Sequence, residues 1–166
     1  MTLATAPLST GSRAASDEFQ LVVFELGEER YGLDIATVYE IIRHQPVTAV
    51  PQAPSFVEGV INLRGRIIPV VDLRRRFGMM AGELTKASRI VVCEAAGTRV
   101  GLVVDGVSDV ITLAPEEIKP VPEFGAALHT RFMKGIGTVG ERLIILVDIE
   151  RLMTSPDMAL IDEAAA

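Results

Sequence analysis

Runs of Val, Ile and Leu about as long as β-strands recur along the chain, and turns that contain glycine separate them. Apolar residues at helical spacing are scarce over longer windows. The pattern predicts a mostly β fold with four short helices, at DIATVYEIIR (34–43), DLRRRFG (72–78), FGAALHTRF (124–132) and DIERLM (148–153).

The chain also contains an internal repeat, in which three segments match without gaps and in the same order. LVVFEL (21–26) matches IVVCEA (90–95), GLDIATVYEII (32–42) matches GLVVDGVSDVI (101–111), and SFVEGVINLRGRIIPVVDLRRRF (55–77) matches RFMKGIGTVGERLIILVDIERLM (131–153). Chance similarity between β-rich segments does not produce such an order. We therefore expect two similar small β-barrels, packed together because neither half alone buries much core.

The ends of the chain differ from the repeat. Residues 1–17 are rich in Ser, Thr, Ala and Gly and are expected to form a disordered tail, while residues 161–166 are expected to fray. The domain then spans residues 18–160. Its first subdomain covers about 18–85 and its second about 86–153, with an exchange of terminal strands left open.

Composition narrows the function classes. A formal net charge of −6 over 166 residues, with a pI near 5.0, argues against general nucleic-acid binding, which requires a clustered basic surplus. The single cysteine, Cys93, is expected to be a buried structural thiol. No apolar run reaches the length of a membrane span, and the N-terminus lacks the pattern of a targeting peptide, so a cytoplasmic protein is expected.

Catalytic signals are absent. His44 and His129 are the only histidines, and the sequence contains no CxxC, HExxH, GxSxG or phosphate-binding glycine loop. Asp72 and Asp148 occupy equivalent repeat positions and could form a carboxylate dyad. However, each stands where a strand meets a short helix, which favours a capping role, and Gly78 is expected to end the first helix. We predict no enzyme, no metal site and no cofactor.

The arginines of NLRGRIIPVVDLRRRFG differ in position and in whether they recur in the second half of the repeat. Arg74, Arg75 and Arg76 are expected to lie on a solvated helix face, with their aliphatic stems against the protein. Arg66 recurs as Arg142 and is assigned to the shared hairpin, whereas Arg64 is replaced by Gly140. A residue specific to one half is the better functional candidate, which favours Arg64. Glu40 is the predicted ion-pair partner of Arg64.

Four segments resemble the CheW family of chemotaxis coupling proteins: EERYGLDIATVYEIIR, PSFVEGVINLRGRIIPVVDLRRRFG, GLVVDGVSDVITLAPEEIKPVPEF and ERLIILVDIERL. The resemblance covers about residues 17–160. It implies two intertwined SH3-like β-barrel subdomains packed as one CheW-like domain, in agreement with the repeat. It also implies no catalytic activity and no cofactor.

The resemblance further implies a cytoplasmic adaptor that links methyl-accepting chemoreceptors to the histidine kinase CheA, is recruited to membrane-associated receptor arrays and does not insert into the membrane. Receptor contact in this family is attributed to the groove between the barrels and the flank of the first barrel. That implies a receptor-binding role for Val38, Glu40, Gly59, Arg64, Gly101 and Val107. Kinase contact is attributed to exposed apolar strands and loops at the barrel ends, where Phe124 is the candidate.

Two alternatives remain open. A CheW-like paralogue that serves a non-flagellar pathway would carry the same motifs. An SH3-like nucleic-acid binder could use Arg64, Arg66 and Arg74–Arg76, but the sequence offers it no Trp and only two Tyr for base stacking, and its net charge is negative.

Overall fold

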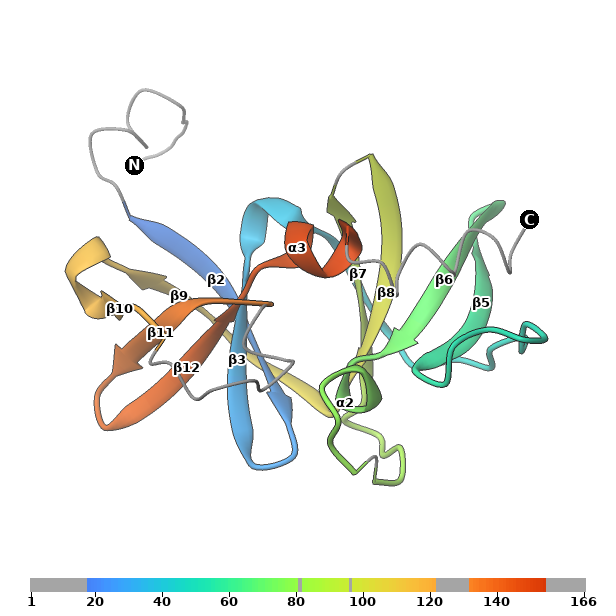
Figure 1. The fold of residues 1–166 in the computed structure, drawn as a ribbon, viewed down its shortest axis with the longest axis horizontal. Helices are drawn as coiled ribbons and strands as arrows, with labels where there is room; N and C mark the ends of the chain where they lie inside the picture. Colours follow the sequence, from blue (N-terminus) through green and yellow to red (C-terminus); the bar gives the residue numbers. More distant parts are fainter. Residues whose placement is uncertain (1–17, 81, 96, 122–131, 155–166) are drawn as a thin grey trace.

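The computed structural model describes residues 18–80, 82–95, 97–121 and 132–154 (Figure 1). Most of these residues form strands, which confirms the mostly β prediction. The elements, in chain order, are β2 (Phe19–Leu26), β3 (Glu29–Asp34), the 3-10 turn η2 (Ile35–Thr37), β4 (Val38–Arg43), β5 (Val57–Leu63), β6 (Arg66–Asp72), α2 (Leu73–Arg76), β7 (Arg89–Ala95), β8 (Thr98–Val104), β9 (Gly106–Leu113), the 3-10 turn η3 (Pro115–Glu117), β10 (Ile118–Lys119), β11 (Met133–Val139), β12 (Arg142–Val147) and α3 (Ile149–Thr154).

The strands form two sheets, which lie side by side with α2 and α3 between them (Figure 1). The five-stranded sheet, with the order β4-β7-β8-β6-β5, is called the first barrel, and the six-stranded sheet, with the order β10-β11-β12-β3-β2-β9, the second barrel. Each takes strands from both halves of the sequence. β2 and β3 join the second barrel, and β7 and β8 join the first, so the two halves are intertwined.

The internal repeat is preserved in the topology. Aligning the repeated segments maps β5-β6-β8-β7-β4 onto β11-β12-β3-β2-β9, which is the order found in the second barrel. The register agrees as well, because Gly101 lies opposite Val70 in the parallel pair β6–β8, and Gly32 lies opposite Leu146 in the parallel pair β12–β3. The two barrels are therefore related residue by residue.

Several strands are buried on both faces, which explains their continuous apolar runs. In β7, Ile90 and Val92 point into the core of the first barrel, whereas Val91 and Cys93 point into a larger cluster shared by both barrels. This central cluster contains Phe24, Leu26, Tyr31, Leu33, Val71, Leu73, Phe77, Val91, Cys93, Val100, Leu102, Val104, Phe132, Val147, Ile149 and Leu152. Burial raises the pKa of the Cys93 thiol to about 12, in keeping with an inert core residue.

Both strand-to-helix junctions have the predicted caps. The Asp72 carboxylate accepts a hydrogen bond from the Arg74 amide at 3.1 Å, and Asp148 accepts one from the Arg151 amide at 3.1 Å. Gly78 follows α2 with φ +74°, the left-handed conformation expected after a helix end. The capping interpretation of the two aspartates is therefore confirmed.

The helix predicted over residues 34–43 is wrong. Asp34 caps only the 3-10 turn η2, and Val38–Arg43 then form β4. The β-branched and aromatic side chains in VYEIIR favour an extended backbone, and pairing with β7 satisfies its polar groups. The segment that matches Val38–Ile42 in the second half of the repeat also forms a strand, β9. Of the helix predicted over residues 124–132, all but the last residue lies outside the described residues.

The predicted solvated face for Arg74–Arg76 is also wrong for two of the three residues. Arg74 is only 3% exposed and contacts both Asp72 and Asp105 at 3.0 Å, joining α2 to the start of β9. The Arg76 guanidinium lies over the rings of Phe56 and Phe132, at 5.0 and 4.5 Å from the ring centres. Consecutive helical residues point in different directions. Arg74 is therefore buried, Arg75 is half exposed, and Arg76 lies over two aromatic rings.

Candidate functional site

Arg64 occupies the turn between β5 and β6 in an uncommon conformation. Its φ is +52° and that of the following Gly65 is +84°, so both turn residues are left-handed, as a tight hairpin requires. The Asn62 side chain supports the turn by accepting a hydrogen bond from the Gly65 amide at 2.8 Å. A non-glycine residue in this region is strained, and retaining arginine rather than glycine points to a role for its side chain.

The predicted ion pair between Arg64 and Glu40 is present. The two terminal nitrogens of the guanidinium each donate to one oxygen of the Glu40 carboxylate, both at 2.5 Å. This two-point contact holds the guanidinium in one orientation. The hydrogen bonds from Arg64 hold the pKa of the Glu40 carboxyl below its ordinary value. The Arg64 side chain remains 67% exposed, so the positioned cation faces solvent.

Tyr39 and Arg99 extend this surface, although no sequence argument selected them. Tyr39 is half exposed at a β-bulge in β4, and the Arg99 guanidinium lies 3.8 Å from the centre of its ring. Arg99 also donates to Glu94 at 2.7 Å. The comparison that singled out Arg64 would have found Tyr39, because its counterpart in the second half is Ser108.

The second barrel does not reproduce this arrangement. Gly140 stands in place of Arg64 with φ +60°, so the turn is kept while the cation is lost. Asp109 stands in place of Glu40, and its carboxylate accepts from the neighbouring Val110 amide at 2.8 Å. The aromatic and charged surface formed by Tyr39, Glu40, Arg64 and Arg99, here called the β4 surface, therefore belongs to the first barrel.

Val38 and Val107 lie at equivalent positions in β4 and β9, and both pack partly buried against the central cluster. Three positions later, each strand carries one exposed aliphatic residue: Ile41 in β4 and Val110 in β9. Ile41 lies opposite Val91 of the central cluster, and Val110 lies opposite the buried Val22. Both edge strands thus carry exposed aliphatic side chains beside buried ones.

Gly59 and Gly101 are buried and have a different environment. A Cβ on Gly59, whose φ is +151°, would lie 2.1 Å from the Thr48 carbonyl oxygen. A Cβ on Gly101 would lie 2.7 Å from the Ile90 side chain. Both glycines recur in the repeat, as Gly135 and Gly32. The structure therefore brings Glu40 and Arg64 together, while these glycines allow close approach of backbone and side chains inside the first barrel. Phe124 lies outside the described residues.

The β4 surface has the composition of a protein interface. Among the described residues, no three His, Cys, Asp or Glu side chains gather as a metal site would require. In the same residues, no helix has the length and apolar character needed to cross a membrane. An aromatic ring beside oriented charges and edge-strand aliphatic residues is a composition found at protein interfaces.

The chain is similar to known proteins over nearly its full length. Residues 20–157 match the family model described as a CheW-like domain. The Chemotaxis protein CheW of Klebsiella aerogenes is 43% identical over 162 residues, covering 96% of this chain and 98% of that protein. Its namesake from Thermotoga maritima is 34% identical over 142 residues, covering 84% of this chain and 90% of that protein.

A solved structure agrees with both the fold and the sequence. The crystal structure of the scaffolding protein TtCheW from Thermoanaerobacter tengcongensis superimposes with a TM-score of 0.77 at 40% identity, covering 84% of this chain and 94% of that chain. The two sheets, the intertwined halves and the family match point to one conclusion. This chain belongs to the CheW-like family of chemotaxis coupling proteins.

Proposed function

We propose that the protein is a non-catalytic adaptor that couples methyl-accepting chemoreceptors to the histidine kinase CheA. It acts in the cytoplasm and is recruited to receptor arrays at the membrane through these partners. Neither activity nor a cofactor is required, because each step is a binding event. The observation that carries the proposal is the exposed Arg64 guanidinium, which Glu40 orients in one barrel of a duplicated fold.

The receptor tip, a helical hairpin, would bind at the β4 surface and at the edge strand β9 of the second barrel. Helix-in-groove recognition requires aliphatic positions for the apolar face of a helix and a few fixed charges for register. Val38, Val107 and the exposed Ile41 supply the first requirement, and Arg64 supplies the second. The aromatic ring of Tyr39, held by Arg99, is a further anchor of the kind that dominates interface energies.

The kinase would bind elsewhere on the protein, at the barrel ends, with Phe124 as the proposed contact. Two binding faces on one rigid unit allow the receptor state to bias the kinase without chemistry in the adaptor. A receptor tip that fits the β4 surface differently in its two signalling states shifts the kinase equilibrium by the difference in binding free energy.

Pull-down of a receptor cytoplasmic fragment and of CheA by the purified protein tests this assignment. Arg64→Glu is expected to lose receptor capture and keep CheA capture. Arg66→Glu is the matched control, because Arg66 is exposed in the same hairpin and recurs in both halves. Joint loss of receptor and CheA capture by Arg64→Glu, or equal loss of receptor capture by both variants, would contradict the proposed receptor site.

Phe124→Ser, in the same assay, is expected to lose CheA capture and retain the receptor. Reconstitution of receptor, CheA and this protein then tests the function as a whole. The wild-type protein should raise receptor-dependent kinase activity, and Arg64→Glu should not. No stimulation by the wild-type protein would refute the coupling role.

A further inference from the structure

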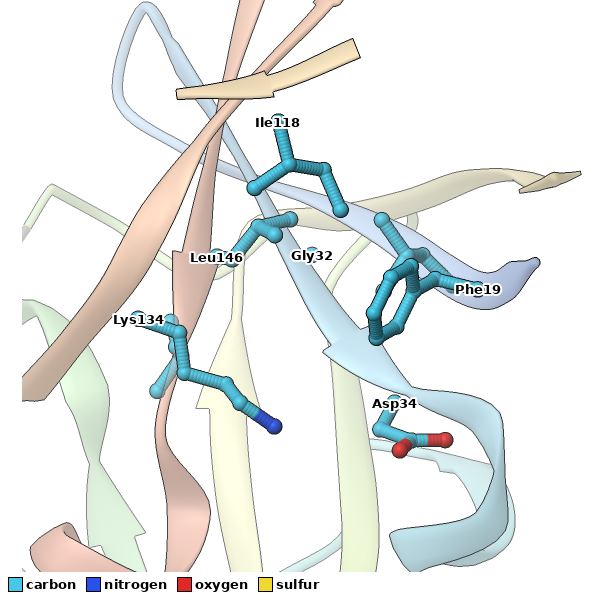
Figure 2. Close-up of a pocket in the computed structure, with 8 residues that line it drawn as sticks. Phe19, Gly32, Asp34, Ile118, Lys134 and Leu146 are labelled. Carbon is cyan, nitrogen blue, oxygen red and sulfur yellow. The ribbon is translucent and has the colours of Figure 1, made fainter. Parts of the chain in front are cut away.

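The second barrel contains a pocket of about 130 Å³ that the β4 surface does not include (Figure 2). Its wall is mostly apolar, with Phe19, Leu21, Ile118, Leu146 and Val147 around the backbone of Gly32. The Lys134 side chain, from β11, and the Asp34 side chain, from the end of β3, lie at two places on the lower edge of the view, with Asp34 below the Phe19 ring (Figure 2). The pocket thus has an apolar wall and a rim with one charge of each sign.

The residues at the equivalent positions of the first barrel differ in size and polarity. Leu21 and Leu146 correspond to Ile90 and Val70, which are fully buried in the core of the first barrel. Asp34 corresponds to Val103, which is also buried in that core. The Asp34 carboxylate accepts instead from the Ala36 amide at 2.9 Å, as the cap of η2. Asp34 of the second barrel thus stands where the first barrel has a core valine.

The rim differs between the barrels in the same way. Lys134 corresponds to Glu58, and the Glu58 carboxylate contacts the His44 ring at 2.7 Å. Charged residues at the mouth of the first barrel are therefore used within the protein. In the second barrel, the Lys134 side chain extends along the open pocket (Figure 2). Asp34 and Lys134 at the rim of the second barrel therefore take the places of Val103 and Glu58 in the first.

Size decides what the pocket can hold. Pockets that enclose whole small molecules measure about 300–1,000 Å³, whereas a cavity of about 150 Å³ holds one benzene-sized group. At about 130 Å³ this pocket accepts one aliphatic or aromatic side chain. Flanking charges of both signs are then matched by a peptide segment that carries the opposite charges on either side of that side chain.

We propose that this pocket docks one aliphatic or aromatic side chain of a partner protein, in a segment that places a basic residue near Asp34 and an acidic residue near Lys134. None of the pocket-lining residues belongs to the β4 surface, so the proposal does not depend on the receptor site proposed above. Burial of the anchor side chain supplies the affinity, and the two rim charges select the segment.

Peptide titration of the full-length, ¹⁵N-labelled protein tests this proposal by amide chemical shifts. The probe is an N-acetylated, C-amidated pentapeptide, Lys-Gly-Leu-Gly-Glu. Saturable shifts are expected at the amides of Gly32, Ile118 and Val147. Replacing the leucine by alanine should abolish them, and replacing both charged residues by glutamine should weaken binding severalfold. Lys134→Glu should also weaken binding severalfold, whereas the equally exposed control Lys86→Glu should not.

Three results would overturn the proposal. The first is the absence of saturable shifts with up to about 10 mM peptide, because the dissociation constant expected for a single anchor side chain is no higher than about that concentration. The second is binding that Lys134→Glu leaves unchanged, since the peptide would then lie elsewhere. The third is free L-leucine shifting the same amides at the same or lower concentration, which would identify a small-molecule site instead.

Discussion

Arg64 and Glu40, 24 residues apart in the chain, are joined by two parallel hydrogen bonds of 2.5 Å that connect the β5–β6 turn to β4. The ion pair links the turn after the edge strand β5 to the interior of the edge strand β4 and leaves the guanidinium exposed. It lies on the surface, so its contribution is to orient a binding group rather than to stabilise the fold. This distinction can be tested.

Charge reversal at Arg64 should therefore separate binding from folding. Arg64→Glu is expected to weaken receptor binding at least tenfold, the loss typical of a hot-spot arginine, with little change in the thermal unfolding midpoint. The double variant Arg64→Glu with Glu40→Arg should recover part of the affinity, measured by titration calorimetry. A double variant no better than Arg64→Glu alone would show that the pair does not orient the binding group.

Arg64→Gly removes the side chain and keeps the turn. Glycine adopts the φ of +52° without strain, so this variant should unfold at the same or a higher temperature than the wild type while losing receptor binding. A large fall in the unfolding midpoint would mean that Arg64 is mainly structural. The variant is thus a stability control for the charge reversal.

The pair also predicts how the Glu40 carboxyl titrates. Hydrogen bonds from Arg64 lower its pKa in the folded protein from the ordinary value of 4.5. The folded-state value is the depressed one, so the contribution of the pair is fully present above about pH 4.5 and is lost as the pH falls through the lowered pKa. Receptor binding should accordingly show no Glu40 titration between about pH 6 and 8.

Carbon-13 NMR of the Glu40 side chain measures this pKa directly. In Arg64→Gly the value should rise toward 4.5, because the largest cause of the shift has been removed. Arg66→Glu should leave it nearly unchanged. The same Glu40 pKa in wild type and Arg64→Gly would show that the pair does not form in solution.

Arg74 should behave in the opposite way to Arg64. Arg74→Leu removes the buried and closer of the two cations beside the Asp72 carboxylate, which is only 1% exposed, and such a loss costs about 3–5 kcal/mol. Arg75→Leu on the same helix is the matched control, because Arg75 contacts the same carboxylate at 3.6 Å from a half-exposed position, where the expected cost is below about 1 kcal/mol. Urea denaturation measures both. Equal effects would contradict the assignment of Arg74 to a buried network.

Gly59 and Gly101 should affect binding through the fold. Gly101→Ala forces a Cβ to 2.7 Å from Ile90 and is expected to cost about 1–3 kcal/mol, whereas Gly59→Ala meets backbone at 2.1 Å and should cost more. Both variants should lose receptor and kinase capture in proportion to the unfolded fraction measured by circular dichroism. Selective loss of receptor capture from a fully folded variant would instead place that glycine in the interface.

Much of the fold could be predicted because it is encoded locally and then repeated. Strand-length apolar runs indicated the β class, and the two strand-to-helix aspartates indicated both caps. The helix predicted at residues 34–43 was wrong, because the side chains of Val38–Arg43 favour a strand and only Ile35–Thr37 form a 3-10 turn. Comparing that segment with its repeat would have shown that the same pattern occurs in a second strand, β9.

The candidate site was only partly accessible from the sequence. Arg64 and its partner Glu40 could be inferred, because one half of the repeat carries a residue that the other lacks. Arg99 could not, because it recurs as Arg30 and only its position over Tyr39 distinguishes it. The pocket at Asp34 and Lys134 was equally hidden, since its walls come from strands far apart in the chain.

The sequence by itself determined the mostly β class, the duplicated strand order, the two helix caps and the single oriented cation in the NLRG turn. These features depend on residue type and on spacing within a segment, which the chain carries wherever it folds. The tertiary structure alone decided which of three consecutive arginines is buried, which face of each strand meets the central cluster, and which residues line the pocket of the second barrel. Such properties depend on contacts between segments more than 30 residues apart, as Arg74 and Asp105 illustrate at a separation of 31. Local pattern does not specify those contacts, because desolvation and charge pairing depend on every element that packs against a residue.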